Sequence, residues 1–456
     1  MILRQAAAAW LVAGLLVACS ASDQPSSDAT ATNEANSPVA DEITTSAPSD
    51  SDPAPSDSDP APSDSDPAPS DSDPASGGAE DSDEPIGEPD VPLVDTVAPR
   101  DSATTAPTIT EPDLASPDPA ACVDALTTRE RAALVVWPAV YADDWAGAID
   151  NVRTNDVGGV LLMSQAGLTG EQVAQRLADL EAASRHGLII ATDEEGGDVQ
   201  RLRDVSELAS QRIVARDLGI DAATSLISQH GAVVRSLGVD MVFGPVVDVE
   251  PPAAEVPLNP SRFFAGPPET VSAFGGAYLR GWHQAGLFAT LKHYPGHGAA
   301  SGDTHITAGV TPSFEDLEGF DLKPYSDLSE LARATETAVM IGHLTVPGLT
   351  DGVPATRSAA AIDYLRDALG YGDTLLITDA LGMAAVGIPE PEASVLALEA
   401  GIDIVIFTLS SQTDEVIDAI TAATESGRID PAQLDAAARK GIRMLARDGH
   451  TCDSGR

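Results

Sequence analysis

Short apolar runs alternate with longer amphipathic stretches along the chain from residue 118 onward. Short runs are typical of buried strands in a parallel sheet, and longer stretches with helical periodicity are typical of helices that cover it. Eight runs predict strands at 133–140, 157–163, 187–192, 241–247, 287–291, 338–344, 374–378 and 402–409. The segments between them predict helices that include 170–184, 222–236, 269–284, 359–369, 391–399 and 431–446. This alternation predicts an α/β fold, a (β/α)₈ TIM-like barrel, with an open doubly wound sheet as the alternative.

Charged residues follow five of these runs, where the predicted strands stop. They are Asp193, Asp248, Lys292 with His293, His343 and Asp379. The carboxyl ends of parallel strands meet on one face of such a barrel, and that face carries the catalytic site. We therefore expect these side chains to surround one pocket.

The densest group of reactive side chains lies between residues 292 and 305. Lys292-His293-Tyr294-Pro295-Gly296-His297-Gly298 is followed after four residues by Asp303-Thr304-His305, so this short stretch holds three of the eight histidines. A lysine, an aspartate and three imidazoles in so short a stretch are typical of an active site.

The amino-terminal quarter of the chain has a different composition. Residues 1–19 carry one early charge, Arg4, and an apolar run that ends in Leu16-Val17-Ala18-Cys19, which resembles a bacterial lipoprotein signal. The resemblance implies that Cys19 is lipidated and that the protein is extracytoplasmic and anchored to the bacterial cell membrane. An ordinary secretory signal, which would release the protein, and a single membrane helix are the alternatives.

Residues 20–117 are rich in Ser, Asp and Pro and include four tandem copies of Pro-Ser-Asp-Ser-Asp-Pro-Ala. Such a segment has too few apolar side chains to offset its ordering entropy. We predict a disordered tether here, followed by a single catalytic domain at 118–456.

Net charge and cysteine content narrow the possible partners and compartment. The formal net charge is −46, and removing the 24 acidic and 2 basic residues of segment 1–120 leaves about −24. A surface this acidic argues against nucleic acid as a partner, because binding phosphates needs clustered Lys and Arg. Cys122 and Cys452 lie at the two edges of the predicted domain and can form a disulfide in an oxidising compartment, with two free thiols as the alternative.

Three motifs together resemble glycoside hydrolase family 3, in particular its bacterial β-N-acetylglucosaminidases. They are the segment 292–305, the strings Asp193-Glu194-Glu195-Gly196-Gly197 and Val199-Gln200-Arg201, and Thr378-Asp379-Ala380-Leu381-Gly382-Met383. The resemblance covers about residues 125–447. It implies a retaining mechanism in which Asp379 is the nucleophile and His305, oriented by Asp303, is the acid/base.

The same resemblance implies which residues line the subsite of the non-reducing sugar. These are Asp193, Arg201, Arg262, Lys292 and His293. His297 is expected to hold the loop by hydrogen bonds, and no metal or organic cofactor is implied. The chain departs from the family pattern at Asp198, where arginine is usual, and at Ala380, where a second aspartate is frequent, so the preference for an N-acetyl sugar is less secure than the reaction type.

The sequence therefore predicts a monomeric, exo-acting β-N-acetylglucosaminidase that acts on cell-wall (peptidoglycan) fragments or chitin oligomers. A β-glucosidase or β-xylosidase of the same family, a phosphorolytic enzyme and a non-catalytic wall-binding lipoprotein are the alternatives. A metal hydrolase is a further alternative, because imidazole and carboxylate ligands occur at short spacing in His293, His297, Asp303 and His305. Pro295-Gly296 argues against it, because this pair prevents a helix that would place the first two histidines on one face.

Overall fold

The computed structural model describes residues 120–251, 260–302, 304 and 306–447. The predicted signal segment with Cys19, the predicted tether, Asp303, His305 and Cys452 lie outside these residues. Cys122 is disulfide-bonded in the structure, but its pairing with Cys452 stays a prediction. No helix within the described ranges has the length and apolar character needed to cross a membrane.

Each of the eight predicted apolar runs overlaps one parallel strand. The strands are β1 (Val136–Val140), β2 (Gly159–Leu162), β3 (Ile189–Thr192), β6 (Met241–Val242), β7 (Thr290–Tyr294), β9 (Ala338–Ile341), β11 (Leu376–Thr378) and β12 (Val405–Phe407). All their residues are buried, as expected for strands covered on both faces. The first run begins too early, because a capping box between Thr127 and Glu130 starts helix α1 (Thr128–Leu134), which includes the run's first two residues.

The eight strands form two parallel sheets, a five-stranded one in the order β12-β1-β2-β3-β6 and a three-stranded one in the order β11-β9-β7. Isolated parallel bridges connect them at two places. Met241 pairs with Phe288 and Val246 with Lys292 between β6 and β7, and Ile377 pairs with Ile404 between β11 and β12. The chain thus has an α/β fold built on parallel strands.

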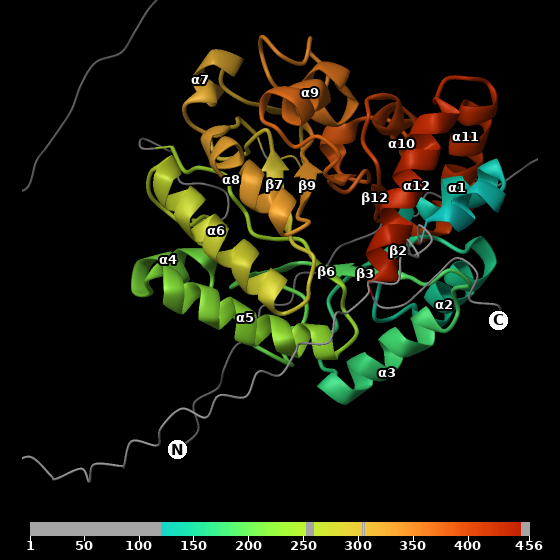
Figure 1. The fold of residues 1–456 in the computed structure, drawn as a ribbon, viewed down its shortest axis with the longest axis horizontal. Helices are drawn as coiled ribbons and strands as arrows, with labels where there is room; N and C mark the ends of the chain where they lie inside the picture. Colours follow the sequence, from blue (N-terminus) through green and yellow to red (C-terminus); the bar gives the residue numbers. More distant parts are fainter. Residues whose placement is uncertain (1–119, 252–259, 303, 305, 448–456) are drawn as a thin grey trace, which may run out of the picture. The chain divides into compact units, whose positions relative to one another are not determined.

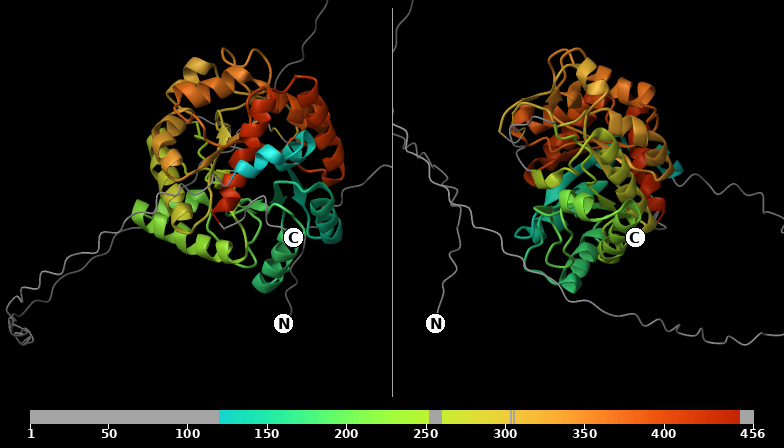
Figure 2. Two further views of the ribbon diagram at one scale, coloured as in Figure 1. Left: turned by 45° about the vertical axis from the view of Figure 1, so that its right-hand side comes forward. Right: turned by 90° about the vertical axis from the view of Figure 1, so that its left-hand side faces the viewer.

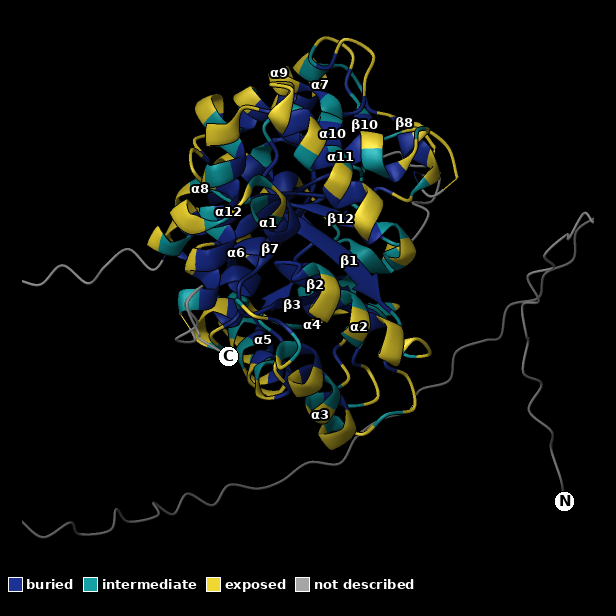
Figure 3. Cartoon of the chain, turned by 90° about the vertical axis from the view of Figure 1, so that its right-hand side faces the viewer, coloured by how far each residue is buried: buried dark blue, intermediate teal, exposed yellow. Residues whose placement is uncertain are grey.

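Helices lie outside the strands in all views (Figures 1 and 2). They are α2 (Trp145–Asn155), α3 (Gly170–Glu181), α4 (Gln211–Asp217), α5 (Ile220–Ser236), α6 (Pro268–Gln284), α7 (Phe314–Glu318), α8 (Lys323–Ala334), α9 (Ala359–Asp363), α10 (Glu390–Glu399), α11 (Thr413–Glu425) and α12 (Pro431–Ala446). Figure 3 shows their exposed residues facing outward and the buried strands between them. In α3, for example, Val173, Leu177 and Leu180 recur at helical spacing and are buried.

The six predicted helices are present, with one change of geometry. The segment predicted as a helix at 359–369 starts as α9 and continues as a π-helical turn, η4 (Tyr364–Ala368).

Short elements lie in the loops after the strands and at the start of the described chain. They are η1 (Ala121–Ala125), β4 (Glu194–Gly196), β5 (Val199–Gln200), η2 (Pro260–Arg262), β8 (Gly309–Val310), β10 (Leu344–Thr345), η3 (Ala355–Arg357), η5 (Ala384–Val386) and η6 (Ser410–Gln412). The antiparallel pair β4–β5 directly follows β3. This hairpin carries part of the candidate site.

Candidate active site

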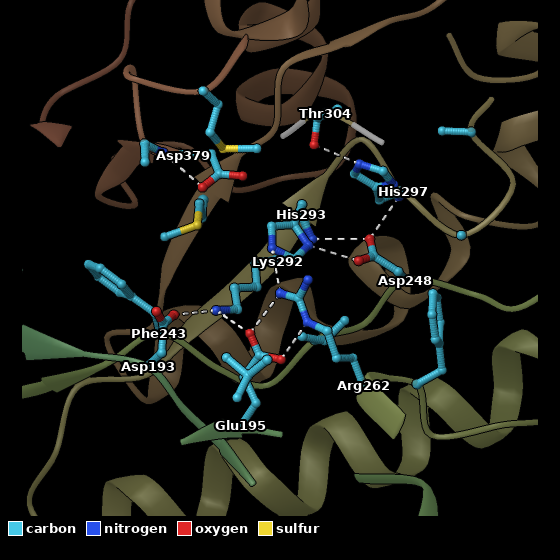
Figure 4. Close-up of a pocket in the computed structure, with 18 of the residues that line it drawn as sticks. Asp193, Glu195, Phe243, Asp248, Arg262, Lys292, His293, His297, Thr304 and Asp379 are labelled. Atoms are coloured by element: carbon cyan, nitrogen blue, oxygen red, sulfur yellow. Dashed lines mark hydrogen bonds and ion pairs between the residues drawn. The ribbon is translucent and has the colours of Figure 1, made fainter. Parts of the chain in front are cut away.

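The predicted site residues line one pocket of about 980 Å³, and they come from strand β7 and from loops that follow other strands. All six that lie within the described residues line it: Asp193, Arg201, Arg262, Lys292, His293 and Asp379. Figure 4 shows the side chains of Asp193, Arg262, Lys292, His293 and Asp379 around this pocket. The expectation that strand-end charges surround one pocket is confirmed for Asp193, Asp248, Lys292, His293 and Asp379, but it is wrong for His343, which does not line the pocket.

Lys292 joins two carboxylates at the base of the pocket. Its Nζ lies 2.8 Å from Oδ1 of Asp193 and 2.6 Å from Oε1 of Glu195, and its side chain is only 2% exposed. Burial opposes the ammonium charge, but the two carboxylates outweigh burial and raise the pKa of Lys292. The three side chains therefore stay charged together.

Arg201 holds Asp193 from its other side. Its Nη2 donates to Oδ2 of Asp193 at 2.8 Å, and Nε lies 3.2 Å from the same oxygen. Burial alone would raise the pKa of Asp193, but the adjacent Lys292 and Arg201 lower it below its usual value. Asp193 is thus an ionised hydrogen-bond acceptor in the pocket at neutral pH.

Arg262 makes a bidentate contact with Glu195. Its Nε and Nη2 donate to the two carboxylate oxygens at 2.7 and 2.8 Å, the arrangement that gives this pair its geometric specificity. Burial opposes both charges, yet the pKa of Glu195 is lowered by Arg262 and Lys292, and that of Arg262 is raised by Glu195.

A carboxylate from the loop after β6 organises the histidine segment. Nδ1 of His293 donates to Oδ2 of Asp248 at 2.8 Å, and the backbone N–H groups of His293 and His297 donate to Oδ1 at 3.1 and 2.8 Å. Burial opposes ionisation, but the His293 side chain, together with the charge and backbone N–H of His297, lowers the pKa of Asp248 to about 2. Asp248 thus fixes both the ring and the backbone of this segment.

Asp379 follows β11 and is partly exposed to the pocket. Burial would raise its pKa. The pKa is nevertheless lowered by the nearby His293, His343 and Lys292 side chains and by the backbone N–H of Ala380. The Ala380 N–H donates to Oδ1 of Asp379 at 2.8 Å. A carboxyl group kept ionised at the pocket wall has the protonation state that a nucleophile requires.

His343 lies behind the Asp379 loop. Nε2 of His343 lies 3.0 Å from the carbonyl oxygen of Ala380, and Nδ1 lies 3.0 Å from Oγ1 of Thr356. The ring can donate to the carbonyl through Nε2 while accepting from the Thr356 hydroxyl at Nδ1. Desolvation lowers the pKa of His343, which favours this neutral form.

The loop that follows β7 passes very close to the loop after β6. A Cβ added at Gly298 would lie 1.8 Å from the carbonyl oxygen of Val249, so only glycine permits this approach. Nε2 of His297 lies 3.0 Å from Oγ1 of Thr304, which also lines the pocket. The hydrogen-bonding role expected for His297 is therefore present, on a loop whose residues Asp303 and His305 lie outside the described part.

Sequence reasoning missed Glu195 as a site residue, although Glu195 belongs to a string of three acidic residues that begins with Asp193. It placed Asp248 at the pocket as a strand-end carboxylate but assigned it no role in the site. The signal for Asp248 was available, because it follows an apolar run as Asp193 and Asp379 do. The signal for Glu195 was its two-residue spacing from Asp193, which places both side chains on one side of an extended segment.

Apolar side chains complete the pocket wall. They are Leu161, Met163, Phe243, Val246, Met340, Met383 and Ile406. The pocket thus combines ion-paired polar groups with a hydrophobic lining, as small-molecule sites commonly do. Within the described residues no three His, Cys, Asp or Glu side chains form a group that could hold a metal ion, and the metal alternative, which needs Asp303 and His305, stays a prediction.

Comparison with known proteins identifies the family of this fold and pocket. Residues 136–444 match the Glycosyl hydrolase family 3 N terminal domain. The chain is 34% identical over 374 residues to Beta-hexosaminidase LpqI of Mycobacterium tuberculosis, covering 78% of this chain and 94% of the relative. It is also 34% identical over 285 residues to Beta-hexosaminidase of Stenotrophomonas maltophilia, covering 59% and 82%.

Solved structures agree with this assignment. The structure of M. tuberculosis LpqI superimposes with a TM-score of 0.66 at 35% identity, covering 72% of this chain and 96% of that one. A glycoside hydrolase family 3 beta-N-acetylglucosaminidase from Paenibacillus sp. gives a TM-score of 0.64 at 29% identity, covering 73% and 64%. The chain therefore belongs to glycosyl hydrolase family 3, as its motifs predicted, and is a glycoside hydrolase.

Proposed function

We propose that this chain is an exo-acting, retaining β-N-acetylglucosaminidase that removes terminal N-acetylglucosamine from cell-wall fragments or chitin oligomers. The observation that carries the proposal is Asp379, an ionised carboxylate on the wall of a pocket whose base holds the ion-paired groups around Lys292. The names of the relatives, which are beta-hexosaminidases, support the choice of sugar.

In the first step of the proposed mechanism, Asp379 attacks the anomeric carbon and the bond to the leaving oxygen breaks, which gives a covalent glycosyl-enzyme. His305 donates a proton to the leaving oxygen. It then removes a proton from the water that releases the sugar, while Asp303 fixes its tautomer. Support for this dyad comes from Thr304, the residue between the two, which lines the pocket.

The ion-paired residues at the base of the pocket are proposed to bind the hydroxyl groups of the terminal sugar. Asp193 can accept hydrogen bonds, and Arg262 and Lys292 can donate them; each of these groups is already held in place by its ion pair. Preorganised charges of this kind cost little reorganisation when substrate binds. Met340, Met383 and Ile406 offer apolar contact for the methyl group of an N-acetyl substituent.

Two structural proposals accompany the activity. The eight parallel strands are proposed to close into a (β/α)₈ barrel, a closure supported by the bridges that link β6 to β7 and β11 to β12.

Cys19 is proposed to be lipidated, so that residues 20–117 tether the enzyme to the outer side of the cell membrane. A Cys19→Ala variant should then move from the membrane fraction to the soluble fraction.

The activity is tested by incubating the full chain with aryl β-glycosides of N-acetylglucosamine, glucose and xylose, each with and without phosphate. Preferential hydrolysis of the N-acetyl sugar supports the proposal. Preference for glucose or xylose contradicts the choice of sugar, and a glycosyl phosphate as the main product contradicts hydrolysis. Binding of N-acetylglucosamine without turnover of any glycoside would support the non-catalytic alternative.

A further inference from the structure

Three consecutive carboxylates follow β3, and they divide between the pocket and the interior. Asp193 and Glu195 line the pocket, whereas Glu194 does not and is 0% exposed. Side chains alternate between the two sides of an extended segment. Because Asp193 and Glu195 face the pocket, Glu194 points to the opposite side, into the interior. Glu194 therefore cannot contact a substrate in the pocket, and its buried carboxylate must have a different role.

Three donors converge on the Glu194 carboxylate. Oε1 accepts from the backbone N–H of Leu202 at 2.8 Å, and Oε2 accepts from Nε2 of Gln200 at 2.9 Å. Nε2 of His230, on helix α5, lies 3.1 Å from Oε2. One side chain thus links β4, β5, the turn that follows and a helix of the outer layer.

His230 is itself fixed by two further contacts. Its Nδ1 lies 2.9 Å from Oγ of Ser206, and its ring meets Trp282 edge to face at a centroid distance of 5.8 Å. If the Ser206 hydroxyl donates to Nδ1, then Nε2 carries the proton and donates to Glu194. Among the residues that the structure describes, His230 is the one ionisable basic group paired with Glu194.

A carboxylate buried to this degree is costly unless its oxygens are fully hydrogen-bonded. The three donors provide that satisfaction only while the segment 193–208 keeps its present path. Ser206 adds to this constraint, because its carbonyl oxygen accepts from Gln200 Nε2 at 2.6 Å, and Leu208 N–H donates to Gln200 Oε1 at 3.0 Å. The network therefore specifies one conformation of the hairpin and turn.

This conformation determines the geometry of the pocket groups. Leu202, which Glu194 anchors, directly follows Arg201, whose guanidinium holds Asp193. The Arg201 backbone N–H also donates to the carbonyl oxygen of Asp193 at 3.1 Å. A shift of Glu194 would move both of its neighbours, Asp193 and Glu195, together with Arg201.

We propose that Glu194 is a positioning residue for substrate binding, supported by His230 and Ser206, which sets the placement of Asp193, Glu195 and Arg201 from behind the pocket. This inference rests on the proposed function. Glu194 acts through its neighbours, so its loss should weaken binding of the sugar more than it slows the chemical step.

The test compares Glu194→Ala and Glu194→Gln in the full chain, with an aryl β-N-acetylglucosaminide as substrate. The alanine variant leaves the Leu202 N–H and one N–H of the Gln200 amide without an acceptor, so KM should rise about tenfold or more while kcat changes about threefold or less. Glutamine keeps an oxygen acceptor for Leu202 and can donate to His230 in its other tautomer, but its amide N–H faces the Gln200 amide, so this variant should raise KM less than Glu194→Ala does.

Asp403→Ala is the matched control, because it also removes a buried, hydrogen-bonded carboxylate. The Asp403 carboxylate accepts from the Leu376 N–H and forms ion pairs with Arg366 and Lys440, and Asp403 does not line the pocket. It should lower the melting temperature and leave KM unchanged. His230→Leu removes one of the three donors and provides a milder variant should Glu194→Ala fail to fold; its KM should rise about threefold.

Unchanged KM in folded Glu194→Ala or His230→Leu, or an equal rise in KM in the Asp403→Ala control, would overturn the positioning role. These outcomes leave the proposed function intact, since they presuppose an active wild type. A wild-type chain that cleaves none of the three aryl glycosides would overturn both the proposed function and this inference.

Discussion

Nδ1 of His293 donates a hydrogen bond of 2.8 Å to the carboxylate of Asp248, and this contact fixes which nitrogen of the ring faces the pocket. Nε2 is left to accept from Nη2 of Arg262 at 3.2 Å. In the series of hydrogen bonds from Asp248 through His293 and Arg262 to Glu195, each donor thus faces an acceptor.

Replacing Asp248 with asparagine should disrupt this order. Three donors reach the two carboxylate oxygens, and an amide offers one oxygen and an N–H group that would face a donor. We expect kcat/KM to fall at least about tenfold. Asp373→Asn, at an exposed position, is the control and should keep full activity.

The same variant has a stability signature that depends on pH. The folded pKa of Asp248, about 2, lies below the value of about 4 for an unfolded aspartate. Its contribution is therefore present above about pH 4 and is lost as pH falls toward 2, and it amounts to on the order of 2 kcal/mol. Urea denaturation should show that Asp248→Asn is destabilised at pH 7 and that the difference shrinks near pH 3; a constant difference would contradict the account.

Arg262→Lys should lower activity strongly, although it keeps the positive charge. Lysine cannot reproduce the two parallel hydrogen bonds to the buried Glu195 or the contact with His293. We expect kcat/KM for the aryl glycoside to fall about 10- to 100-fold. Arg428→Lys changes an exposed arginine that bridges Glu392 and Glu399 on the surface, and steady-state kinetics should show it unchanged.

Thr356→Val tests the contacts that support Asp379, the proposed nucleophile. Valine keeps the volume of threonine but removes the hydroxyl that fixes the His343 ring, which in turn holds the Ala380 carbonyl. We expect kcat to fall about three- to tenfold with little change in KM, because the effect reaches Asp379 and not the sugar-binding groups. Thr424→Val removes a hydroxyl that only bonds within α11; an equal loss of kcat there would refute a specific role for Thr356.

Asp321 should make the protein less stable at alkaline pH. Burial raises its pKa to about 7, with a smaller contribution from Asp248, although the Val249 N–H donates to it at 3.4 Å. Because the folded pKa exceeds the unfolded one, stability falls as pH rises from about 4 to about 7. Asp321→Asn should match the wild type near pH 4 and exceed it by about 4 kcal/mol at pH 8. Equal stability of the two proteins at pH 8 would refute a protonated Asp321.

The sequence predicts the strands well because a buried parallel strand needs a continuous apolar run, and that requirement is local. Strand ends are harder, as the run at 287–291 illustrates: β7 spans Thr290–Tyr294 and thus includes Lys292 and His293. These polar residues belong to the strand because ion pairs with the distant Asp193, Glu195 and Asp248 make their burial tolerable. No local pattern contains that information.

Some site residues could likewise be predicted from the local pattern, and others depend on tertiary contacts. Asp193, Lys292, His293 and Asp379 follow or end apolar runs, so topology alone predicts that they meet. His343 occupies an equivalent sequence position, yet its ring packs against Thr356, which comes from a segment with no apolar pattern of its own. Tertiary contacts of this kind decided which strand-end residues face the pocket.

The proposed covalent bond between Asp379 and an N-acetylglucosaminyl group can be trapped with a fluorinated N-acetylglucosaminyl donor that glycosylates the enzyme quickly and is released slowly. Proteolysis and mass spectrometry of the labelled full chain then identify the modified residue. We predict one added sugar per chain, on Asp379, and no labelling of Asp379→Asn. A label on another residue, or an Asp379→Asn variant that still hydrolyses the substrate, would contradict the account.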